Sequence, residues 1–70
     1  MERFPLDSDA LASLGYDPAH RVLEVEFTNG RVYRYFGVPA REVQRLVDAP
    51  SRGAYFSRRV RDRYPYEPVH

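Results

Sequence analysis

The stretch LEVEFTNGRVYRYFGV, residues 23–38, decides the fold that this sequence predicts. Two runs in which apolar and polar residues alternate flank Asn29 and Gly30. Asn and Gly tolerate the positive φ angles that tight hairpins need, and a period of two is typical of half-buried strands. The stretch therefore predicts a β-hairpin.

The length of the turn decides which side chains share a face of this hairpin. A two-residue type I′ turn would pair Thr28 with Arg31 and place Arg34 among the apolar side chains. A three-residue turn, with Gly30 left-handed as a G1 bulge, pairs Phe27 with Arg31 instead. We predict the bulged register, because it gives one apolar face and one charged face. Its pairs are Val25 with Tyr33, Leu23 with Tyr35, and Glu24 with Arg34.

The length and composition indicate one small folded domain. The chain has 70 residues, 43% hydrophobic residues and a net charge of +1. A chain this short builds only a thin core, which we expect to span residues 8–66. Cys is absent, which excludes disulfides and thiolate metal sites and fits a cytoplasmic location. No apolar run reaches the roughly 20 residues of a membrane span, and the N-terminus does not resemble a signal peptide, so we expect no membrane association.

The segments around the hairpin complete a predicted α+β fold. Residues 1–7 read as a loose lead-in, residues 10–16 alternate as a first strand, and residues 17–20 form a turn. Short connections favour a three-stranded antiparallel meander. Residues 65–68 are extended. Two helices follow the hairpin, and we predict that both pack on one face of the sheet.

The two helices are predicted from changes in period and from capping residues. The first begins at Pro39 and ends at Ala49, before Pro50. Ser51 caps the second, which we expect to run to about Arg63. The first helix is expected to bury Ala40, Val43, Leu46 and Val47 and to expose Arg41, Glu42, Gln44 and Arg45. The second is expected to bury Phe56, Val60 and Tyr64.

Positive charge is concentrated in the second helix. All eleven basic residues are Arg. Residues 52–63 contain five Arg and one acidic residue, a net charge of +4, whereas the remainder contains six Arg and nine acidic residues, a net charge of −3. Arg suits contacts with phosphate and stacking on bases, which favours nucleic-acid binding by this segment. The alternative interpretation is a solvated helix face whose Arg side chains cover the edges of the core. The candidate nucleic-acid-binding residues are Arg52, Arg58, Arg59, Arg61, Arg63 and Tyr55.

Two further features have both a functional and a structural interpretation. Ser51 and Gly53 lie at a helix N-terminus, where free N–H groups hold phosphate or are simply capped. Tyr33 and Tyr35 would stack bases if exposed, but the bulged register favours packing under a helix. The predicted structural residues are Tyr33, Tyr35, Gly30, Phe27, Phe56 and Val60.

The sequence shows no catalytic or metal-binding pattern. His20 and His70 have no spaced His or Cys partner for a metal and no evident nucleophile beside them. Glu24 and Glu26 share the outer strand face, where we expect solvated ion-pair partners for Arg34. We therefore expect no enzyme activity, no metal and no cofactor.

The ordered motifs of this chain resemble those of the KTSC domain, a short domain at the C-terminus of some lysyl-tRNA synthetases and a stand-alone bacterial protein. The resemblance covers residues 8–66. It rests on Leu14-Gly15-Tyr16-Asp17, Leu23-x-Val25-x-Phe27-x-x-Gly30, Tyr33-x-Tyr35-x-x-Val38-Pro39, Ala49-x-Ser51-x-Gly53-x-Tyr55-Phe56 and Arg61-x-x-Tyr64-x-Tyr66. Its occurrence beside a synthetase implies RNA or tRNA as a partner.

Two functions follow from these observations. The first is a non-catalytic accessory domain that binds RNA through the Arg-rich second helix. The second is a protein-interaction module, in which a sheet edge or the aromatic tail docks a protein partner or a second copy of the chain.

Overall fold

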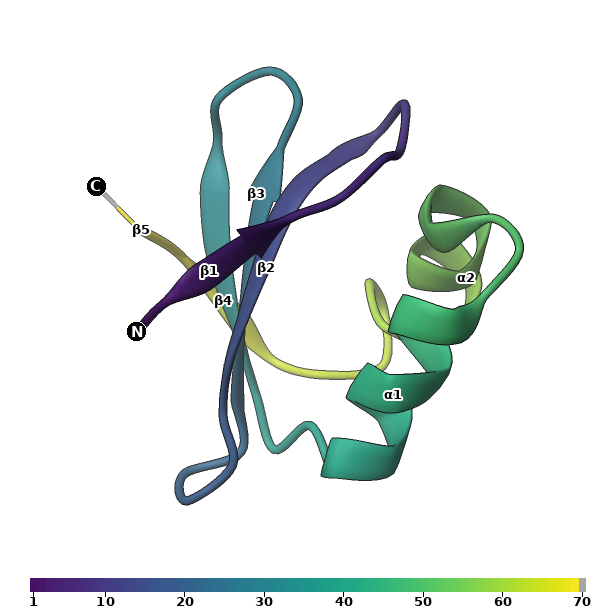
Figure 1. The fold of residues 1–70 in the computed structure, drawn as a ribbon. Helices are drawn as coiled ribbons and strands as arrows, with labels where there is room; N and C mark the ends of the chain where they lie inside the picture. The colour runs from purple at the N-terminus through teal and green to yellow at the C-terminus, as the bar shows by residue number, and fades with distance from the viewer. Residues whose placement is uncertain (70) are drawn as a thin grey trace.

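The computed structural model describes residues 1–69, so His70 and the prediction made for it lie outside the described residues. A five-stranded antiparallel sheet, in the order β1-β2-β3-β4-β5, carries two helices on one face (Figure 1). The helices lie between β4 and β5 in the chain. The elements are β1 (Arg3–Pro5), β2 (Leu11–Asp17), β3 (Val22–Phe27), β4 (Val32–Phe36), α1 (Ala40–Asp48), α2 (Arg52–Arg59) and β5 (Tyr66–Val69).

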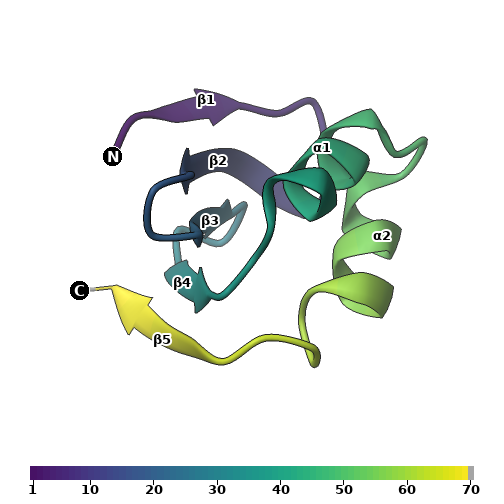
Figure 2. The same cartoon turned by 90° about the horizontal axis from the view of Figure 1, so that it is seen from below.

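The α+β class and the two helices are confirmed, but the prediction of three strands is wrong. The predicted lead-in contains β1, which pairs with β2, and the extended tail contains β5, which pairs with β4. Both are edge strands, as Figure 2 shows. They are short and contain Pro5 and Pro68, residues that edge strands tolerate because they need hydrogen bonds on one side only. Such strands lack the alternation that identifies the central ones.

The bulged register of the β3–β4 hairpin is confirmed. Val25 lies opposite Tyr33, and the other predicted pairs follow in step. The Phe27 N–H donates to the Arg31 carbonyl at 2.8 Å, and the Gly30 N–H donates to the Phe27 carbonyl at 2.9 Å. Gly30 has a φ of 91°, a left-handed conformation that costs glycine little.

The β2–β3 turn and the packing of β1 also follow from particular residues. The Asp17 carboxylate accepts hydrogen bonds from the backbone N–H of Ala19 and of His20, which closes the predicted turn. At Gly15 the strand β1 passes so close that an added Cβ would lie 2.6 Å from the carbonyl oxygen of Glu2. A side chain at position 15 would therefore push β1 away from the sheet.

Helix α1 ends as predicted, but its predicted faces are wrong at two positions. Ala40, the first residue of the helix, was expected to be buried and is exposed. Ala49 before Pro50 is extended, so the helix stops at Asp48. Glu42 was expected to be exposed, yet it is buried and only 5% accessible. The reason is that α2 and the segment after it place hydroxyl groups beside the carboxylate, and their hydrogen bonds offset the cost of burying its charge.

Helix α2 is shorter than predicted. It begins after Ser51, whose side chain accepts a hydrogen bond from the Ala54 N–H as expected, and it ends at Arg59 rather than near Arg63. The N–H groups of Val60 and Arg61 both bond to the Phe56 carbonyl, and the chain then turns. Pro65 disfavours helical conformation in the preceding residue, so the helix could not have continued into β5.

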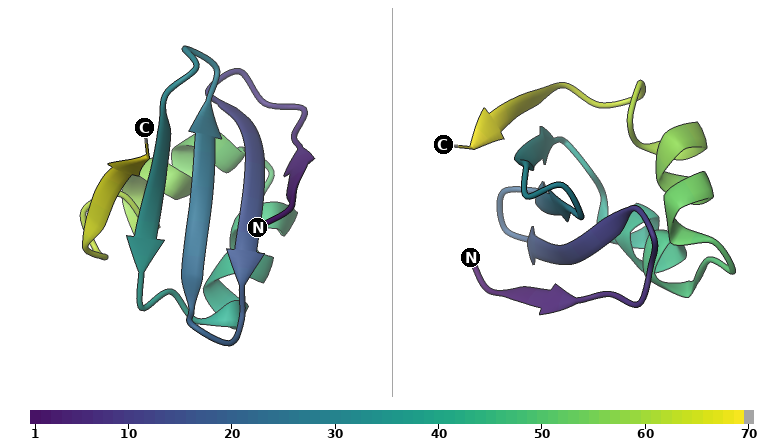
Figure 3. Two further views of the ribbon diagram at one scale, coloured as in Figure 1. Left: turned by 90° about the vertical axis from the view of Figure 1, so that its left-hand side faces the viewer. Right: turned by 90° about the horizontal axis from the view of Figure 1, so that it is seen from above.

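The core lies between the sheet and the helices. Figure 3, left, shows the opposite face of the sheet in front, with both helices behind it. Phe56 and Val60 of the second helical segment are buried against the sheet, as predicted, and Tyr64 packs beside them. The buried apolar residues are Leu11, Leu14, Leu23, Val25, Tyr35, Val38, Val43, Leu46, Phe56 and Val60.

Candidate nucleic-acid interface

An aromatic cluster lies on the helix-facing side of the sheet, at its β4–β5 end. The hairpin register places Phe27 near Tyr33, with ring centroids 5.7 Å apart, and α2 adds Phe56 at 5.4 Å from Phe27. Strand β5 adds Tyr66, at 5.7 Å from Tyr33 and 5.4 Å from Tyr35. Most of these rings meet edge to face, a favourable arrangement for aromatic pairs.

These rings line a groove of about 510 Å³ between the β3–β4 turn, α2 and β5. Its polar rim consists of Asn29 and Arg31 from the hairpin turn, and Arg61 and Asp62 from the turn after α2. Tyr66, 58% exposed, is the most accessible of the rings. The groove therefore combines flat apolar surfaces with groups of both charges.

The floor of the groove contains a polar group without an internal partner. Tyr35 is only 3% exposed, and no hydrogen bond among residues 1–69 involves its hydroxyl. Every fully buried polar side-chain atom among residues 1–69 has a partner, so the Tyr35 hydroxyl, which has none, keeps some access to solvent. Since Tyr35 lines the groove, this access is through the groove. Burial raises the pKa of Tyr35 to about 12, while Asp62 raises this pKa and Arg61 lowers it. Both charged side chains line the same groove as Tyr35.

The rim charges are likewise not neutralised by neighbours. Within residues 1–69 the ion pairs involve other side chains, and neither Arg31, Arg61 nor Asp62 takes part in one. Side chains that the fold does not pair remain free to contact a ligand.

The fold separates the five Arg residues that the sequence places together. Arg61 lines the aromatic groove. Arg63 lies on the side of α1, with its Nη1 3.9 Å from the Glu42 Oε1, and Arg59 lies beside Tyr55. The Arg52 Nε donates to the Val47 carbonyl at 3.0 Å, so this side chain also has a structural role. Arg58 is exposed. Because α2 ends at Arg59 and not near Arg63 as predicted, Arg63 does not share a helix with Arg52 and Arg59.

Glu42 is the centre of a second polar cluster, between α1 and α2. Its carboxylate accepts hydrogen bonds from the hydroxyls of Tyr55 and Tyr64, the latter at 3.1 Å. Burial and the bond to Glu42 raise the pKa of both Tyr55 and Tyr64. These hydroxyls hold the helices together, so any contact that Tyr55 makes with a base would use its ring.

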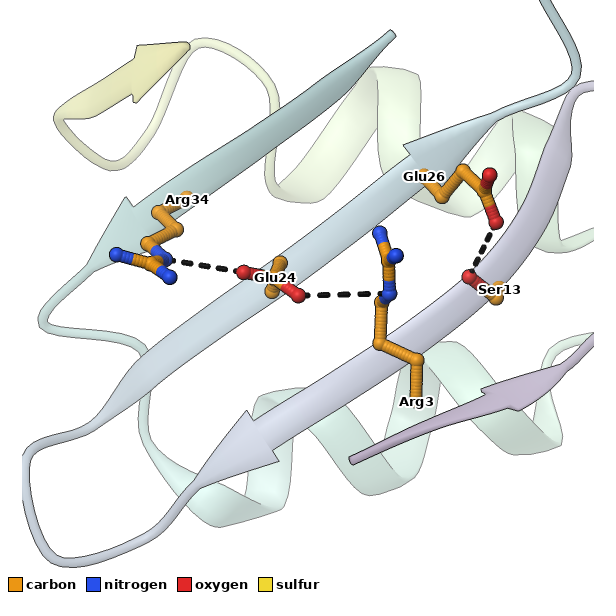
Figure 4. Close-up of polar contacts among 5 residues, drawn as sticks. All are labelled: Arg3, Ser13, Glu24, Glu26 and Arg34. Carbon is orange, nitrogen blue, oxygen red and sulfur yellow. Dashed lines mark hydrogen bonds and ion pairs between the residues drawn. The ribbon is translucent and has the colours of Figure 1, made fainter. Parts of the chain in front are cut away.

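The outer face of the sheet carries a third polar cluster, drawn in Figure 4. Glu24 is only 6% exposed, so the expectation of a solvated carboxylate is wrong. The Arg34 Nε donates to one of its oxygens at 3.0 Å, which confirms the predicted pair, and the Arg3 Nε lies 3.4 Å from the other. Ser13 donates to Glu26 at 2.8 Å. The missed strand β1 supplies Arg3 and thereby covers Glu24.

The N-terminus of α2 is already occupied in part. Ser51 caps it, and a Cβ added at Gly53 would lie 3.2 Å from the Ala10 side chain, so Gly53 serves packing. The hollow beside it is also lined by Asp7 and Asp9, whose charges oppose an anion. Binding of an anion by Ser51 and Gly53 stays a prediction.

Sequence reasoning missed Arg31, Asn29 and Tyr66 as members of a site. Tyr66 lies in an edge strand whose register cannot be read from its sequence. The position of Arg31 follows from the hairpin register. That it lies on the same groove as Arg61 depends on where α2 ends, which the sequence did not show.

The described residues show neither of two further kinds of site. No three His, Cys, Asp or Glu side chains of residues 1–69 gather where they could hold a metal ion. Neither helix in that range has the length and apolar character to cross a membrane.

The five-stranded sheet and its two helices define a small α+β domain. Residues 7–64 match the KTSC domain, and the chain belongs to the KTSC domain family. The family resemblance in the sequence is thereby confirmed.

Relatives of this chain occur alone and within longer proteins. An uncharacterized protein of Stutzerimonas stutzeri (strain A1501) is 51% identical over 57 residues, which cover 81% of this chain and 80% of the relative. A lysine–tRNA ligase of Nostoc sp. (strain PCC 7120) is 34% identical over 67 residues, which cover 91% of this chain but only 12% of the ligase. The match thus concerns a small part of the ligase.

A solved structure has the same fold. The crystal structure of a KTSC domain protein from Yersinia pestis matches with a TM-score of 0.93 and 34% sequence identity, over 99% of this chain and 97% of that one.

Proposed function

We propose that this domain is a non-catalytic accessory module of the cytoplasm that binds single-stranded regions of RNA, tRNA included. Bases enter the aromatic groove, and Arg side chains at its rim and along α2 contact phosphates. Arg31 and Arg61 are the nearest to the groove, and Arg58, Arg59 and Arg63 extend the positive surface. The combination of a positive rim and aromatic faces is what a single-stranded nucleic-acid site needs.

The observation that carries this proposal is the set of unpaired polar groups around the aromatic groove. Arg31, Arg61 and the Tyr35 hydroxyl lack partners within residues 1–69, whereas the Arg side chains on the outer sheet face are paired with Glu24. The match to a segment of lysine–tRNA ligases agrees with RNA as the ligand class.

An electrophoretic mobility shift with total tRNA and with a short unstructured RNA, repeated across a salt series, tests the proposal. The logarithm of the affinity should fall with the logarithm of salt concentration at a slope of roughly −0.7 per single-strand phosphate neutralised. Absence of salt-dependent binding at low ionic strength would refute RNA binding.

Paired variants locate the binding surface. Arg31→Ala with Arg61→Ala should flatten the slope by about one to two units. Arg59→Ala with Arg63→Ala removes the same charge on the side of α1 and reports whether that surface takes part. Arg3→Ala with Arg34→Ala is the matched control on the outer face and should leave the slope unchanged in protein that melts cooperatively.

Exposed sheet edges favour a protein-interaction module as the second candidate. Strands β1 and β5 each have one unpaired edge, and Phe4 of β1 is 43% exposed. Purification at low salt separates the candidates. An RNA binder carries nucleic acid and a raised absorbance at 260 nm, whereas an interaction module elutes without it, as a dimer or with a bound protein.

A further inference from the structure

We infer that the aromatic groove selects an unpaired guanine, and that Asp62 is the residue that determines this specificity. The inference rests on the proposed RNA-binding function and names the base that the same site takes.

Among residues 1–69, Asp62 is the only acidic residue that lines the groove. A carboxylate beside Arg31 and Arg61 weakens the attraction of phosphate, so it does not serve backbone binding. It forms no ion pair within residues 1–69, and it lines the same groove as Tyr35. It is therefore available to a ligand.

The chemistry of a carboxylate favours one base. An ionised carboxylate has two acceptor oxygens and no donor. The Watson–Crick edge of guanine offers two adjacent donors, at N1 and N2, whereas adenine, cytosine and uracil each offer only one donor along that edge. Unpaired bases in RNA are commonly read on this edge while they stack on aromatic rings.

The rest of the groove complements the same base. Tyr35 and Tyr33 pack against Tyr66, yet Tyr66 stays 58% exposed, so part of its ring is accessible to a stacking base. The Tyr35 hydroxyl lies on the floor as a donor that the fold leaves unused, suited to a ring nitrogen or carbonyl oxygen of the base.

Fluorescence anisotropy with labelled UUGUU, UUAUU and UUCUU, at one low salt concentration, tests the inference. We expect the full chain to bind UUGUU about tenfold more tightly than the other two, the discrimination typical of a bidentate contact. Asp62→Asn should reduce this preference to under about threefold, because an amide offers only one acceptor. It should not weaken UUAUU, because it removes a negative charge.

A second variant tests the floor of the groove. Tyr35→Phe keeps the ring and removes the hydroxyl, so UUGUU should bind roughly threefold more weakly, the usual effect of losing one neutral hydrogen bond. Thermal melts of both variants confirm that they are folded.

Each outcome has one meaning. A guanine preference that Asp62→Asn abolishes supports the inference. Equal binding of the three RNAs, or a preference that persists in Asp62→Asn, overturns the inference and leaves the proposed function standing. If no RNA binds, the proposed function fails, and the inference fails with it.

Discussion

Polar side chains on the outer face of the sheet are paired with one another, whereas those in the aromatic groove are not. On the outer face, Arg3 and Arg34 both pair with the buried Glu24, and Ser13 satisfies Glu26. In the groove on the helix-facing side, the Tyr35 hydroxyl and the rim charges have no partner among residues 1–69. On the outer face, the ion pair between Arg3 and Glu24 helps to hold β1 to the sheet, whereas the unpaired groups of the groove are those proposed to bind a ligand.

This difference separates residues that fold the domain from those proposed to bind. Breaking a buried, paired group leaves the partner unsatisfied, whereas changing an unpaired exposed group alters stability little. We therefore expect large stability effects from changes on the outer face and binding effects from changes in the groove.

The largest effect is expected from a buried ring in the core between the sheet and α2. Phe56 is 3% exposed and contacts Phe27 and Tyr35, so Phe56→Ala should destabilise the domain by about 3–5 kcal/mol. Tyr66→Ala, at an exposed ring of the same cluster, is the control and should melt close to the parent. A melting temperature of Phe56→Ala within a few degrees of the parent would contradict the core assignment. Chemical denaturation measures both.

Gly15 tests how β1 is held. Because a Cβ there meets the backbone of Glu2, Gly15→Ala should cost about 1–3 kcal/mol in unfolding free energy. In that background β1 is displaced, so Arg3→Ala should cause no further loss. An additive effect of the two changes would mean that Arg3 does not act through the docked strand.

Two carboxylates give a direct comparison of the two sides. Glu24→Gln removes the charge that Arg3 and Arg34 share and should cost about 1–2 kcal/mol. Asp62→Asn removes the same charge from the groove and should leave the denaturation midpoint unchanged. Similar losses in both variants would show that Asp62 has a structural partner.

The sequence predicted the central part of the fold because local rules decide it there. The turn at Gly30 and the alternation of residues 23–38 set the hairpin register, and Pro50 set the end of α1. The edge strands and the burial of Glu42 depend on contacts with distant segments, which no local pattern records. The groove depends on both, and for that reason its aromatic members from β3, β4 and α2 were predicted only as core, and of its charged members only Arg61 was predicted as a ligand contact.

The smallest predicted effect on stability is a dependence on alkaline pH that comes from Tyr35 at the floor of the groove. Burial raises the pKa of Tyr35 from 10.0 to about 12. Its neutral form is therefore favoured by folding, and this contribution to stability is complete below pH 10 and is lost as the pH rises through 12. Tyr35→Phe should remove this part of the alkaline loss, measured as the denaturation midpoint against pH. An identical pH profile in the variant would mean that another group causes the alkaline loss of stability.

The most direct test of the central claim is an NMR titration of the Arg Nε–Hε resonances with a short single-stranded RNA. We expect the chemical shifts of Arg31 and Arg61 to change with added RNA. The shift of Arg34, whose Nε donates to Glu24, should not change. Shifts confined to Arg34 and Arg3, with Arg31 and Arg61 unmoved, would contradict it and place the ligand on the outer face of the sheet.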